Sequence, residues 1–317
     1  METPAPLISV SGAAAPEGGT ACWIEGSGGA RLRAALFERP QARGTVVLSP
    51  GRTEPIEKYF EVIGELRARG FVVLTHDWRG QGLSQRALPD RLRGHVEAAE
   101  AYAADYRLLL DAYAGRLPGP WISLAHSMGA ALVLSALVAG EDRLKAALLT
   151  APMLGVATGP APAWFARLVS EAMVRIGQGG GYALAPSDPA LARFEGNPLT
   201  HDRGRYERYQ AQLRACPDLS LGSPTWGWLK AALSITAALG RPGALEALRL
   251  PVAMVAAGEE RLVLNAVSRA AARRLADGSY AEIPGARHEL LMETDEIRAQ
   301  VWAAFDALAA RVTSPSA

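Results

Sequence analysis

The sequence has very little cysteine. Its two cysteines, Cys22 and Cys216, lie far apart, and neither belongs to a CxxC motif or has histidines at metal-ligand spacing. A disulfide framework or a zinc site is therefore not expected, and we expect no metal ion. So few cysteines are typical of a reducing compartment, which favours the cytoplasm.

Net charge and long apolar runs are also missing. The 33 basic and 32 acidic residues nearly cancel, so no overall field attracts the chain to nucleic acid or to an anionic membrane surface. No segment offers the roughly 18 consecutive apolar residues that an integral membrane helix needs. Residues 1–19 lack the basic start and apolar run of a signal peptide. We expect a flexible leader, at residues 1–19, on a cytoplasmic protein.

What the sequence does contain is the composition of a folded globular protein, with 49% hydrophobic and 21% charged residues. Short apolar, partly β-branched runs recur along it, as expected for strands buried on both faces of a sheet. They occupy residues 45–49, 71–75, 121–124, 146–149 and 252–256. A hairpin of two further strands, at residues 21–25 and 31–37, precedes them.

Helical stretches separate these runs, at residues 56–69, 96–113 and 128–139. The first of them has apolar side chains at three- and four-residue spacing. Because strand and helix alternate, the sequence predicts right-handed βαβ units and an α/β fold with a mostly parallel, doubly wound sheet. Functional residues in such a sheet lie in loops at the carboxyl ends of the strands.

The alternation stops at residue 152 and resumes with another strand after Pro251. In between, short helical pieces are mixed with proline, glycine and aromatic residues. We therefore predict an inserted helical cap at residues 152–239, on a core formed by residues 20–151 and 240–317. The glycine-rich piece at residues 177–181 follows no strand, so we interpret it as a flexible cap loop rather than as a phosphate-binding loop.

Ser127 is the candidate nucleophile. It stands in the sequence AHSMG at residues 125–129, between the predicted strand at 121–124 and the predicted helix. A nucleophile elbow needs small residues two positions before and after its serine, and Ala125 and Gly129 meet that need, although the GxSxG pattern has glycine first. The alternative is a serine that only caps the helix. Ser84 and Ser135 lack this context.

An oxyanion hole is expected beside Ser127. The N–H of Met128 opens a helix, where free amides and the helix dipole favour negative charge. The second donor should come from the loop after the strand at residues 45–49, which reads PGRTE. Because Gly51 lets the backbone come close, we assign this donor to the N–H of Arg52.

His288 is the candidate base, because serine needs a positioned histidine to become nucleophilic at neutral pH. It follows a predicted strand at residues 279–283 and precedes a predicted helix at about 294–308. The other histidines fit less well, since one lies before the serine, one lies within the elbow and two lie in polar stretches. These are His76, His126, His95 and His201.

The carboxylate that orients the histidine is expected after the strand at residues 252–256. Glu259 and Glu260 both stand there, and we choose Glu260, with Glu259 left open. Either gives the chain order of serine, acid and histidine that this type of fold follows. Asp277 is the least implausible substitute.

Five segments resemble the serine-hydrolase group that contains bacterial lysophospholipase L2 and monoacylglycerol lipase, an S33-type hydrolase domain. They are PGRTE at 50–54 with the following Lys58 and Tyr59, HDWRGQGLS at 76–84, LAHSMG at 124–129, GEERLV at 258–263 and GARH at 285–288. The piece PTWGW at 224–228 is similar to lysophospholipases in particular. The resemblance implies an α/β-hydrolase fold and a triad of Ser127, Glu260 and His288. Three positions depart from the family pattern: Pro50 for histidine, Ala125 for glycine and Glu260 for aspartate.

The cap supplies the expected substrate contacts. Trp164, Trp226 and Trp228 stand among apolar cap residues that could line a tunnel for an acyl chain, or could simply form the small core that a cap needs. Arginines at 203, 205, 208 and 214 could meet a phosphate, although such a row more often forms a solvated face. We expect a monoacyl lipid ester, lysophospholipid before monoacylglycerol, with transient membrane contact and no cofactor.

Two other functions remain open. A serine aminopeptidase, iminopeptidase or general carboxylesterase could use the same scaffold; a peptidase would need an acidic pocket for the substrate amine, from Glu54, Glu171 or Glu195. A non-catalytic binding protein could keep the fold but would be expected to have lost part of the triad.

Overall fold

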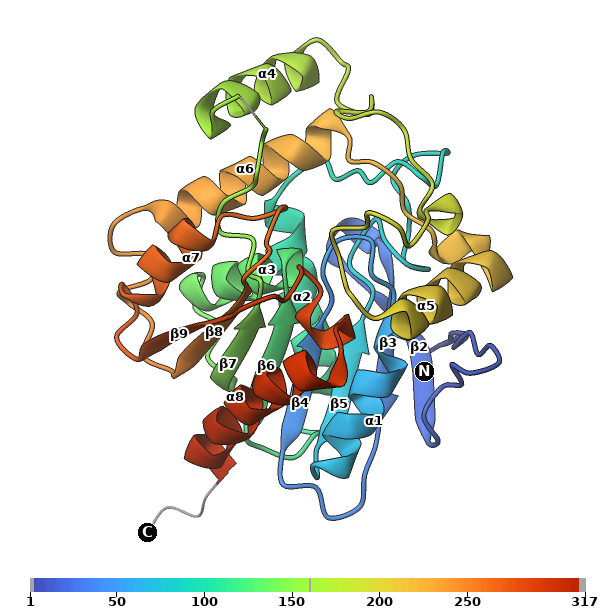
Figure 1. Cartoon of the computed structure of the whole chain (residues 1–317), viewed down its shortest axis with the longest axis vertical. Helices are drawn as coiled ribbons and strands as arrows, with labels where there is room; N and C mark the ends of the chain where they lie inside the picture. Colours follow the sequence, from blue (N-terminus) through green and yellow to red (C-terminus); the bar gives the residue numbers. More distant parts are fainter. Residues whose placement is uncertain (1–2, 160, 314–317) are drawn as a thin grey trace.

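One mixed sheet forms the centre of the molecule (Figure 1). The computed structural model describes residues 3–159 and 161–313. Within them the sheet has the strand order β1-β2-β3-β5-β4-β6-β7-β8-β9. The strands are β1 (Thr3–Pro4), β2 (Gly19–Glu25), β3 (Arg31–Phe37), β4 (Thr45–Ser49), β5 (Val72–His76), β6 (Trp121–His126), β7 (Leu144–Thr150), β8 (Val252–Ala257) and β9 (Gly278–Ile283). From β5 to β9 all neighbours are parallel, whereas β1, β2, β3 and β5 pair antiparallel. The predicted hairpin and mostly parallel sheet are confirmed.

Helices cover both faces of this sheet, as the alternating pattern predicts. They are α1 (Phe60–Ala68), α2 (Glu100–Tyr113), α3 (Met128–Val138), α4 (Ala163–Arg175), α5 (Arg203–Ala215), α6 (Trp226–Gly240), α7 (Asn265–Ala272) and α8 (Asp295–Thr313). Single 3₁₀ turns are η1 (Ser27–Gly29), η2 (Ile56–Tyr59), η3 (Pro189–Leu191), η4 (Pro217–Leu219) and η5 (Leu290–Met292).

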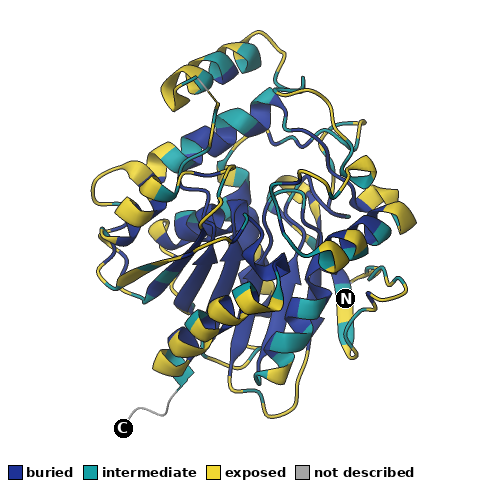
Figure 2. Cartoon of the chain, in the orientation of Figure 1, coloured by how far each residue is buried: buried dark blue, intermediate teal, exposed yellow. Residues whose placement is uncertain are grey.

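The apolar core is split by the sheet into two clusters. Along β4, Val46 and Leu48 join the cluster under α1 and α8, while Val47 joins the cluster under α2 and α3. Successive side chains of a strand point to opposite faces, so a strand covered on both sides is apolar at every position. Figure 2 shows these central strands almost entirely buried.

The order of the strands creates a crevice at one place. From β4 the chain passes to β5 on one side, and later it crosses to β6 on the other side of β4. The loops after β4 and β6 therefore leave the sheet in opposite directions, which is where doubly wound sheets bind ligands. Ser49 and Ala125 are paired at the ends of these strands, so the two candidate catalytic loops begin side by side.

Helices α4, α5 and α6 lie in the segment that we expect to form the cap. Figure 1 shows α4 lying over α6, away from the sheet. The glycine-rich piece is a loop against α6: the amide of Trp226 donates to the carbonyl of Gly181 (3.0 Å), and that of Gly227 to Gly179 (2.8 Å). The division into leader, core and cap remains a prediction, and residues 1–2, 160 and 314–317 of those ranges lie outside the described residues.

Helix α2 begins later than the sequence predicts, at Glu100 instead of residue 96. The reason is a contact with the cap. The amide of Thr225 donates to the carbonyl of Gly94 (3.0 Å), and the Thr225 hydroxyl is within 2.9 Å of His95 Nδ1. These bonds hold the chain before α2 against the start of α6, so the helix forms only beyond them.

The leader contacts the core in its described part. The carbonyl of Pro6 accepts from the Arg33 guanidinium (3.0 Å), and the amide of Ile8 donates to Glu57 (3.1 Å). Arg33 is fully buried and also pairs with Glu57 and Asp77, each at 2.7 Å. The segment that we expected to be flexible is thus attached to a buried ion cluster. No helix within the described residues has the length and hydropathy needed to cross a membrane.

Candidate active site

Ser127 lies at the sharp turn between β6 and α3. Its backbone has φ 50° and ψ −114°, a conformation that is costly for a residue with a Cβ atom. Its N–H donates to the carbonyl of Thr150 (2.9 Å), and its carbonyl accepts from the N–H of Met153 (3.0 Å). The strained residue is therefore fixed from both sides, with its side chain at the carboxyl end of β6.

Small residues on either side of Ser127 make this turn possible. A Cβ atom on Gly129 would lie 2.4 Å from the carbonyl oxygen of Pro50 and 2.5 Å from that of Ser49, so α3 and β4 leave no room for a side chain there. Ala125 is fully buried between the two neighbouring strands. Its methyl group, which departs from the family pattern, packs in the core cluster that α2 and α3 cover.

The structure brings the three predicted catalytic side chains together. Ser127 Oγ lies 2.9 Å from His288 Nε2, and His288 Nδ1 lies 2.7 Å from Glu260 Oε2. His288 follows β9, and Glu260 follows β8. All three residues therefore leave the sheet at its carboxyl edge, which explains how positions so distant in sequence meet.

Of the two glutamates left open, Glu260 contacts His288. Its other oxygen, Oε1, accepts from the amides of Arg261 (2.9 Å) and Leu262 (2.8 Å). Burial disfavours the charged form of Glu260, but His288 and the amides of Leu262 and Val263 outweigh it and hold the pKa below its ordinary value. Glu259 points to solvent with a half-exposed side chain, and Asp277 pairs with Arg311 on the surface.

The remaining histidines have structural partners. His76 is buried against Trp78, and burial lowers its pKa to about 3. His126 is within 3.1 Å of the Thr150 hydroxyl, and burial lowers its pKa to about 4, so it is neutral beside His288. His201 Nδ1 lies 2.8 Å from Glu293. With His95 held by Thr225, none of the four contacts Ser127 Oγ.

The predicted oxyanion donors belong to the two loops that meet at the crevice. Met128 is the first residue of α3, so its N–H lies at the positive end of that helix. Arg52 lies in the loop at residues 50–54, which we call the oxyanion loop. Its carbonyl accepts from the hydroxyl of Thr53 (2.6 Å), which itself has a positive φ of 67°.

The HDWRGQGLS segment holds the oxyanion loop in place. Trp78 Nε1 donates to the carbonyl of Pro50 (2.7 Å). Gln81 donates through Nε2 to the carbonyl of Gly51 (3.0 Å) and accepts from the amide of Thr53 (3.2 Å). The family resemblance includes this segment, but the sequence alone assigns it no role. The structure supplies one, because these side chains fix the backbone that would bind the oxyanion.

A buried ionic cluster lies under the same loop. Glu54 accepts from the Gly51 amide (2.5 Å), the Tyr59 hydroxyl (2.6 Å) and Lys58 Nζ (2.8 Å), and Lys58 also pairs with Glu289 (2.5 Å). Burial alone would raise the pKa of Glu54, but Lys58 and the hydrogen bonds lower it to about 2. Lys58, Tyr59 and Glu289 were not predicted as site residues, although the resemblance included the first two.

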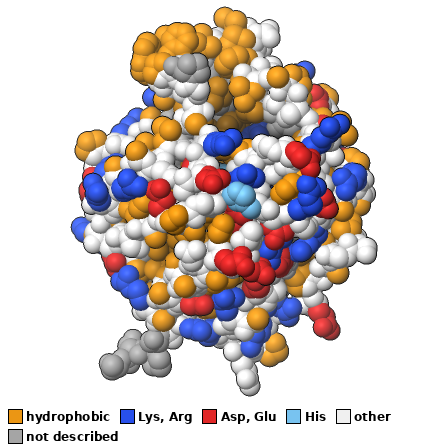
Figure 3. All heavy atoms as spheres, viewed as in Figure 1, with side chains coloured by type: hydrophobic (Ala, Val, Ile, Leu, Met, Phe, Trp, Pro, Cys, Tyr) orange, Lys and Arg blue, Asp and Glu red, His pale blue; other side chains and the backbone are white. Residues whose placement is uncertain are grey.

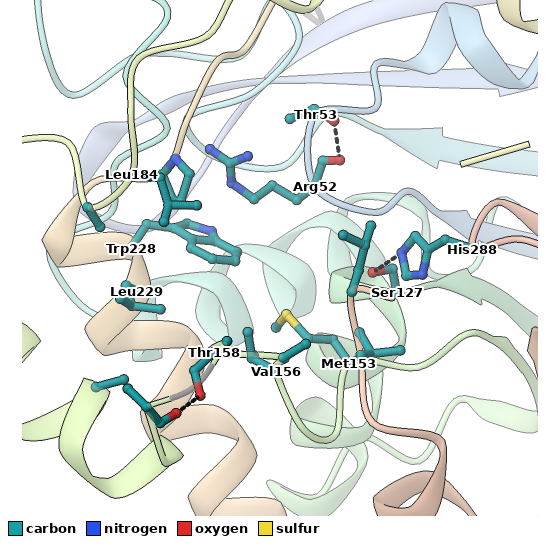
Figure 4. A pocket seen from close by; sticks show the side chains of 18 of the residues that line it. Arg52, Thr53, Ser127, Met153, Val156, Thr158, Leu184, Trp228, Leu229 and His288 are labelled. Atoms are coloured by element: carbon teal, nitrogen blue, oxygen red, sulfur yellow. Dashed lines mark hydrogen bonds between the residues drawn. The ribbon is translucent and has the colours of Figure 1, made fainter. Parts of the chain in front are cut away.

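Ser127 and His288 open into a cavity of about 710 Å³ between core and cap (Figure 4). Its apolar lining comes from both parts of the chain: Met153, Val156, Phe165, Val169, Leu184, Trp226, Trp228, Leu229, Leu262 and Val263. Two of the predicted substrate contacts, Trp226 and Trp228, are among them. Trp164 is not. Its side chain is 68% exposed, because α4 presents the neighbouring Phe165 to the cavity instead.

Three of the four cap arginines that we considered as phosphate contacts are paired elsewhere. Arg205 and Arg208 bind Glu61 at 2.7 and 2.8 Å, and Arg203 pairs with Glu195 and Glu207. These arginines lie outside the lining of the cavity. The acidic residues suggested for a peptide amine are engaged as well: Glu54 by Lys58, Glu171 by Arg167 and Glu195 by Arg203.

A serine, histidine and carboxylate in this arrangement can perform acyl transfer, because the histidine can accept the serine proton while the carboxylate fixes its orientation. Two amides near the serine can stabilise a tetrahedral oxyanion. Among the described residues, no group of three or more His, Cys, Asp or Glu side chains is arranged to hold a metal ion.

A family model described as serine aminopeptidase, S33, matches residues 40–295, which is most of the chain. The chain belongs to the S33 family. The matched S33 region includes the elbow, the oxyanion loop, Glu260 and His288, and it ends at Asp295, the first residue of α8. The family resemblance noted in the sequence is confirmed.

Known proteins similar to this S33 chain are lysophospholipases and lipases. It is 34% identical over 303 residues to lysophospholipase L2 of Escherichia coli K12, covering 90% of this chain and 84% of that protein. It is 27% identical over 260 residues to the probable lysophospholipase L2 of Haemophilus influenzae, covering 82% and 81%.

Two solved structures share its fold. One is a soluble variant of monoglyceride lipase from Saccharomyces cerevisiae in complex with a substrate analog, with a TM-score of 0.72, 17% identity and coverage of 92% of this chain and 95% of that one. The other is a carboxyl esterase from Bacillus coagulans, with a TM-score of 0.72, 16% identity and coverage of 94% and 100%. The predicted α/β-hydrolase fold is confirmed.

Proposed function

We propose that this α/β hydrolase, a carboxylic ester hydrolase, cleaves the single acyl ester of a lysophospholipid or monoacylglycerol through an acyl-enzyme on Ser127. The observation that carries the proposal is the hydrogen-bonded chain from Ser127 to His288 to Glu260 at the wall of an apolar cavity. The cavity volume of about 710 Å³ lies within the range of small-molecule sites, and its lining suits an acyl chain.

The reaction would begin with attack of Ser127 Oγ on the ester carbonyl carbon, while His288 Nε2 accepts the serine proton. The oxyanion would be held by the amides of Met128 and Arg52. Protonated His288 would then give its proton to the leaving alcohol. A water molecule, deprotonated by the same histidine, would hydrolyse the acyl-enzyme and release the fatty acid.

Lysophospholipid is the preferred substrate of the proposal, and monoacylglycerol comes next. The relative that supports this order is the lysophospholipase L2 of Escherichia coli, which matches most of this chain. The similarity to the monoglyceride lipase structure concerns the fold alone. That fold is compatible with an acyl chain running between cap and core.

Replacing Ser127 tests the proposal directly. Ser127→Ala should lower kcat toward lauroyl lysophosphatidylcholine and toward short p-nitrophenyl esters by about a millionfold, the size of loss seen when such a nucleophile is removed. Labelling by a fluorophosphonate probe should disappear with it. Ser135→Ala, which removes a hydroxyl bonded only to its own helix at Ala131, is the matched control and should keep both activities. Full esterase activity in Ser127→Ala would disprove the assignment.

A serine aminopeptidase is the second candidate, because the matching family model carries that description. The geometry supports it less well. The two glutamates in the cavity lining, Glu54 and Glu289, both pair with Lys58 and are not free to bind a substrate amine. Peptide p-nitroanilides with a free amino terminus should therefore be cleaved far more slowly than acyl esters; the reverse order would favour the peptidase.

A further inference from the structure

Arg52 has a side chain that the catalytic scheme does not use. Its guanidinium enters the cavity, where Nη2 donates to the carbonyl of Gly222 (2.6 Å) and Cζ lies 4.9 Å from the ring centre of Trp228. Nε is buried without a hydrogen-bond partner, and the side chain forms no ion pair within the described residues. An arginine in this position has donors and a charge left to satisfy.

Other buried arginines of the chain differ in this respect. Arg33 pairs with Glu57 and Asp77, and Arg298 with Glu61 and Glu65. Burying a guanidinium without a carboxylate is costly, so proteins normally supply one. For Arg52 no carboxylate offsets the burial, and burial lowers its pKa to about 10. The structure therefore keeps a destabilised cation at the wall of a ligand cavity.

Arg86 makes the same region more positive. Its guanidinium donates to the backbone carbonyls of Gly82 (3.0 Å) and Ser220 (3.1 Å), which are neutral acceptors. Burial and the positive charges of Arg91 and Arg52 lower its pKa to about 10, although Asp77 and Asp218 act in the opposite direction. A second arginine therefore adds positive charge near Arg52, with backbone carbonyls as its hydrogen-bond acceptors.

The position of Arg52 suits the head group of the proposed substrate. Its amide is the predicted oxyanion donor, and its extended side chain runs from there to Trp228 (Figure 4). In a lysophospholipid the phosphorus is separated from the ester carbonyl by one glycerol unit, which is about as long as an extended arginine side chain. The same residue can therefore contact the oxyanion with its backbone and the phosphate with its guanidinium.

We propose that the guanidinium of Arg52 binds the phosphodiester of a lysophospholipid and selects it over a neutral monoacylglycerol. The inference rests on the proposed function of the site. Arginine suits this task because its planar fork can form two parallel hydrogen bonds to phosphate oxygens. A glycerol head group without phosphate would leave the buried guanidinium unpaired. The enzyme would therefore bind the transition state of a monoacylglycerol less tightly.

The test compares two substrates in one variant. The ratio of kcat/KM for lauroyl lysophosphatidylcholine to kcat/KM for monolauroylglycerol should fall about ten- to hundredfold in Arg52→Gln. The variant keeps its backbone amide, and both substrates are measured with the same protein. Any loss of activity that a disturbed oxyanion loop causes for both substrates therefore cancels in the ratio. Arg52→Lys keeps the charge but loses the planar fork, so its ratio should lie between those of the wild type and Arg52→Gln. Arg93→Gln, at a surface arginine paired with Asp90, is the control and should keep the wild-type ratio.

A measurement on the unmodified protein keeps the inference testable if the variants do not fold. Glycerophosphocholine should inhibit hydrolysis of a short p-nitrophenyl ester competitively, and glycerol at the same concentration should not. Equal inhibition by both compounds, an unchanged ratio in Arg52→Gln, or a wild-type enzyme that cleaves only monolauroylglycerol would each overturn the role of Arg52. Cleavage of neither lipid by the wild type would instead contradict the proposed function itself.

Discussion

Glu260 carries one methylene more than the aspartate found at this position in the family pattern. The turn after β8 accommodates that length, because Glu260 Oε1 accepts from the amides of Arg261 and Leu262 while Oε2 stays at 2.7 Å from His288 Nδ1. The side chain therefore folds back on its own loop. Its carboxylate remains charged and correctly oriented, which is what a triad requires of its acid.

Two substitutions of Glu260 distinguish the effect of its negative charge from the effect of its side-chain length. Glu260→Gln is expected to lower kcat by about ten-thousandfold, since an amide neither stabilises the imidazolium nor fixes the right tautomer. Glu260→Asp should cost about a hundredfold, the typical penalty for a displacement of roughly 1 Å. Steady-state kinetics with p-nitrophenyl butyrate measure both.

Glu259→Gln is the matched control, because the Glu259 carboxylate is half exposed and lies 3.7 Å from Arg287 rather than at the triad. It should retain wild-type kcat. If Glu259→Gln were the damaging change and Glu260→Gln were neutral, the two assignments would have to be exchanged.

The sequence brought some candidate site residues into view and missed others, for physical reasons. Ser127 and His288 were predictable because their positions follow from strand ends and small flanking residues. The choice between Glu259 and Glu260 depends on which of the two side chains the turn after β8 directs toward His288. Two adjacent identical residues give no sequence pattern that predicts this direction. Trp164 was predicted as a cavity residue because it stands next to Phe165, and which of two adjacent aromatic residues faces the cavity depends on how α4 packs.

Helix α1 is one of the elements that attach the predicted cap to the core. Glu61 on α1 binds Arg205 (2.7 Å) and Arg208 (2.8 Å) of α5 and Arg298 (3.3 Å) of α8. Burial alone would raise the pKa of Glu61, but the hydrogen bond from Arg205 and the charge of Arg298 lower it to about 2. One carboxylate thus joins three helices from distant parts of the chain.

This network predicts a pH dependence of stability. The pKa of Glu61 is depressed in the folded state, so its contribution, on the order of 2 kcal/mol, is fully present above the ordinary value of 4.5 and is lost as pH falls toward about 2. Glu61→Gln lacks that contribution at neutral pH. Its free energy of unfolding should therefore fall less than that of the wild type as the pH is lowered through this range. Urea denaturation at pH 7 and at pH 3 measures the difference.

Glu207→Gln provides the comparison for Glu61. Glu207 lies on α5 but forms an exposed pair with Arg203, with more than half of its side chain accessible. Exposed pairs contribute little, so this variant should follow the wild-type pH curve. Equal pH curves for Glu61→Gln and the wild type would show that the α1 network does not hold the cap.

Elements were predicted best where the chain is buried on both sides, as in β4 and β6. The late start of α2 was not predictable, since it results from bonds between Gly94 and Thr225, which belong to different parts of the chain. The two-residue strand β1 was missed for a similar reason: it is defined by its pairing with β2 rather than by its own residues.

The whole molecule presents an apolar surface at one end. Trp164, Leu168 and Ile176, on or just after α4, have 68%, 55% and 68% of their surfaces exposed. Hydrophobic side chains gather there at the top of Figure 3, and α4 is mostly exposed in Figure 2. Such a patch is unusual on a water-facing surface and is typical of contact with a protein or lipid surface.

We expect this surface to bind lipid vesicles reversibly. Because the chain has a formal net charge of only +1, binding should depend on apolar burial and be similar for zwitterionic and anionic vesicles. The double variant Trp164→Ser with Leu168→Ser should lose most of the sedimentation with vesicles. Leu191→Ser, at an exposed leucine on η3, controls for general loss of hydrophobicity. Vesicle binding that is unaffected by the double change would exclude α4 as the contact.

The order of the catalytic residues along the chain has a consequence for biosynthesis. Ser127 and His288 are 161 positions apart, and a ribosome adds about 5 to 20 residues each second. A nascent chain would therefore carry its serine for roughly 8 to 30 s before the histidine is made. During that time the hydroxyl has no base and is chemically inert. Under the proposed mechanism, an unfinished copy of this enzyme would therefore hydrolyse no ester.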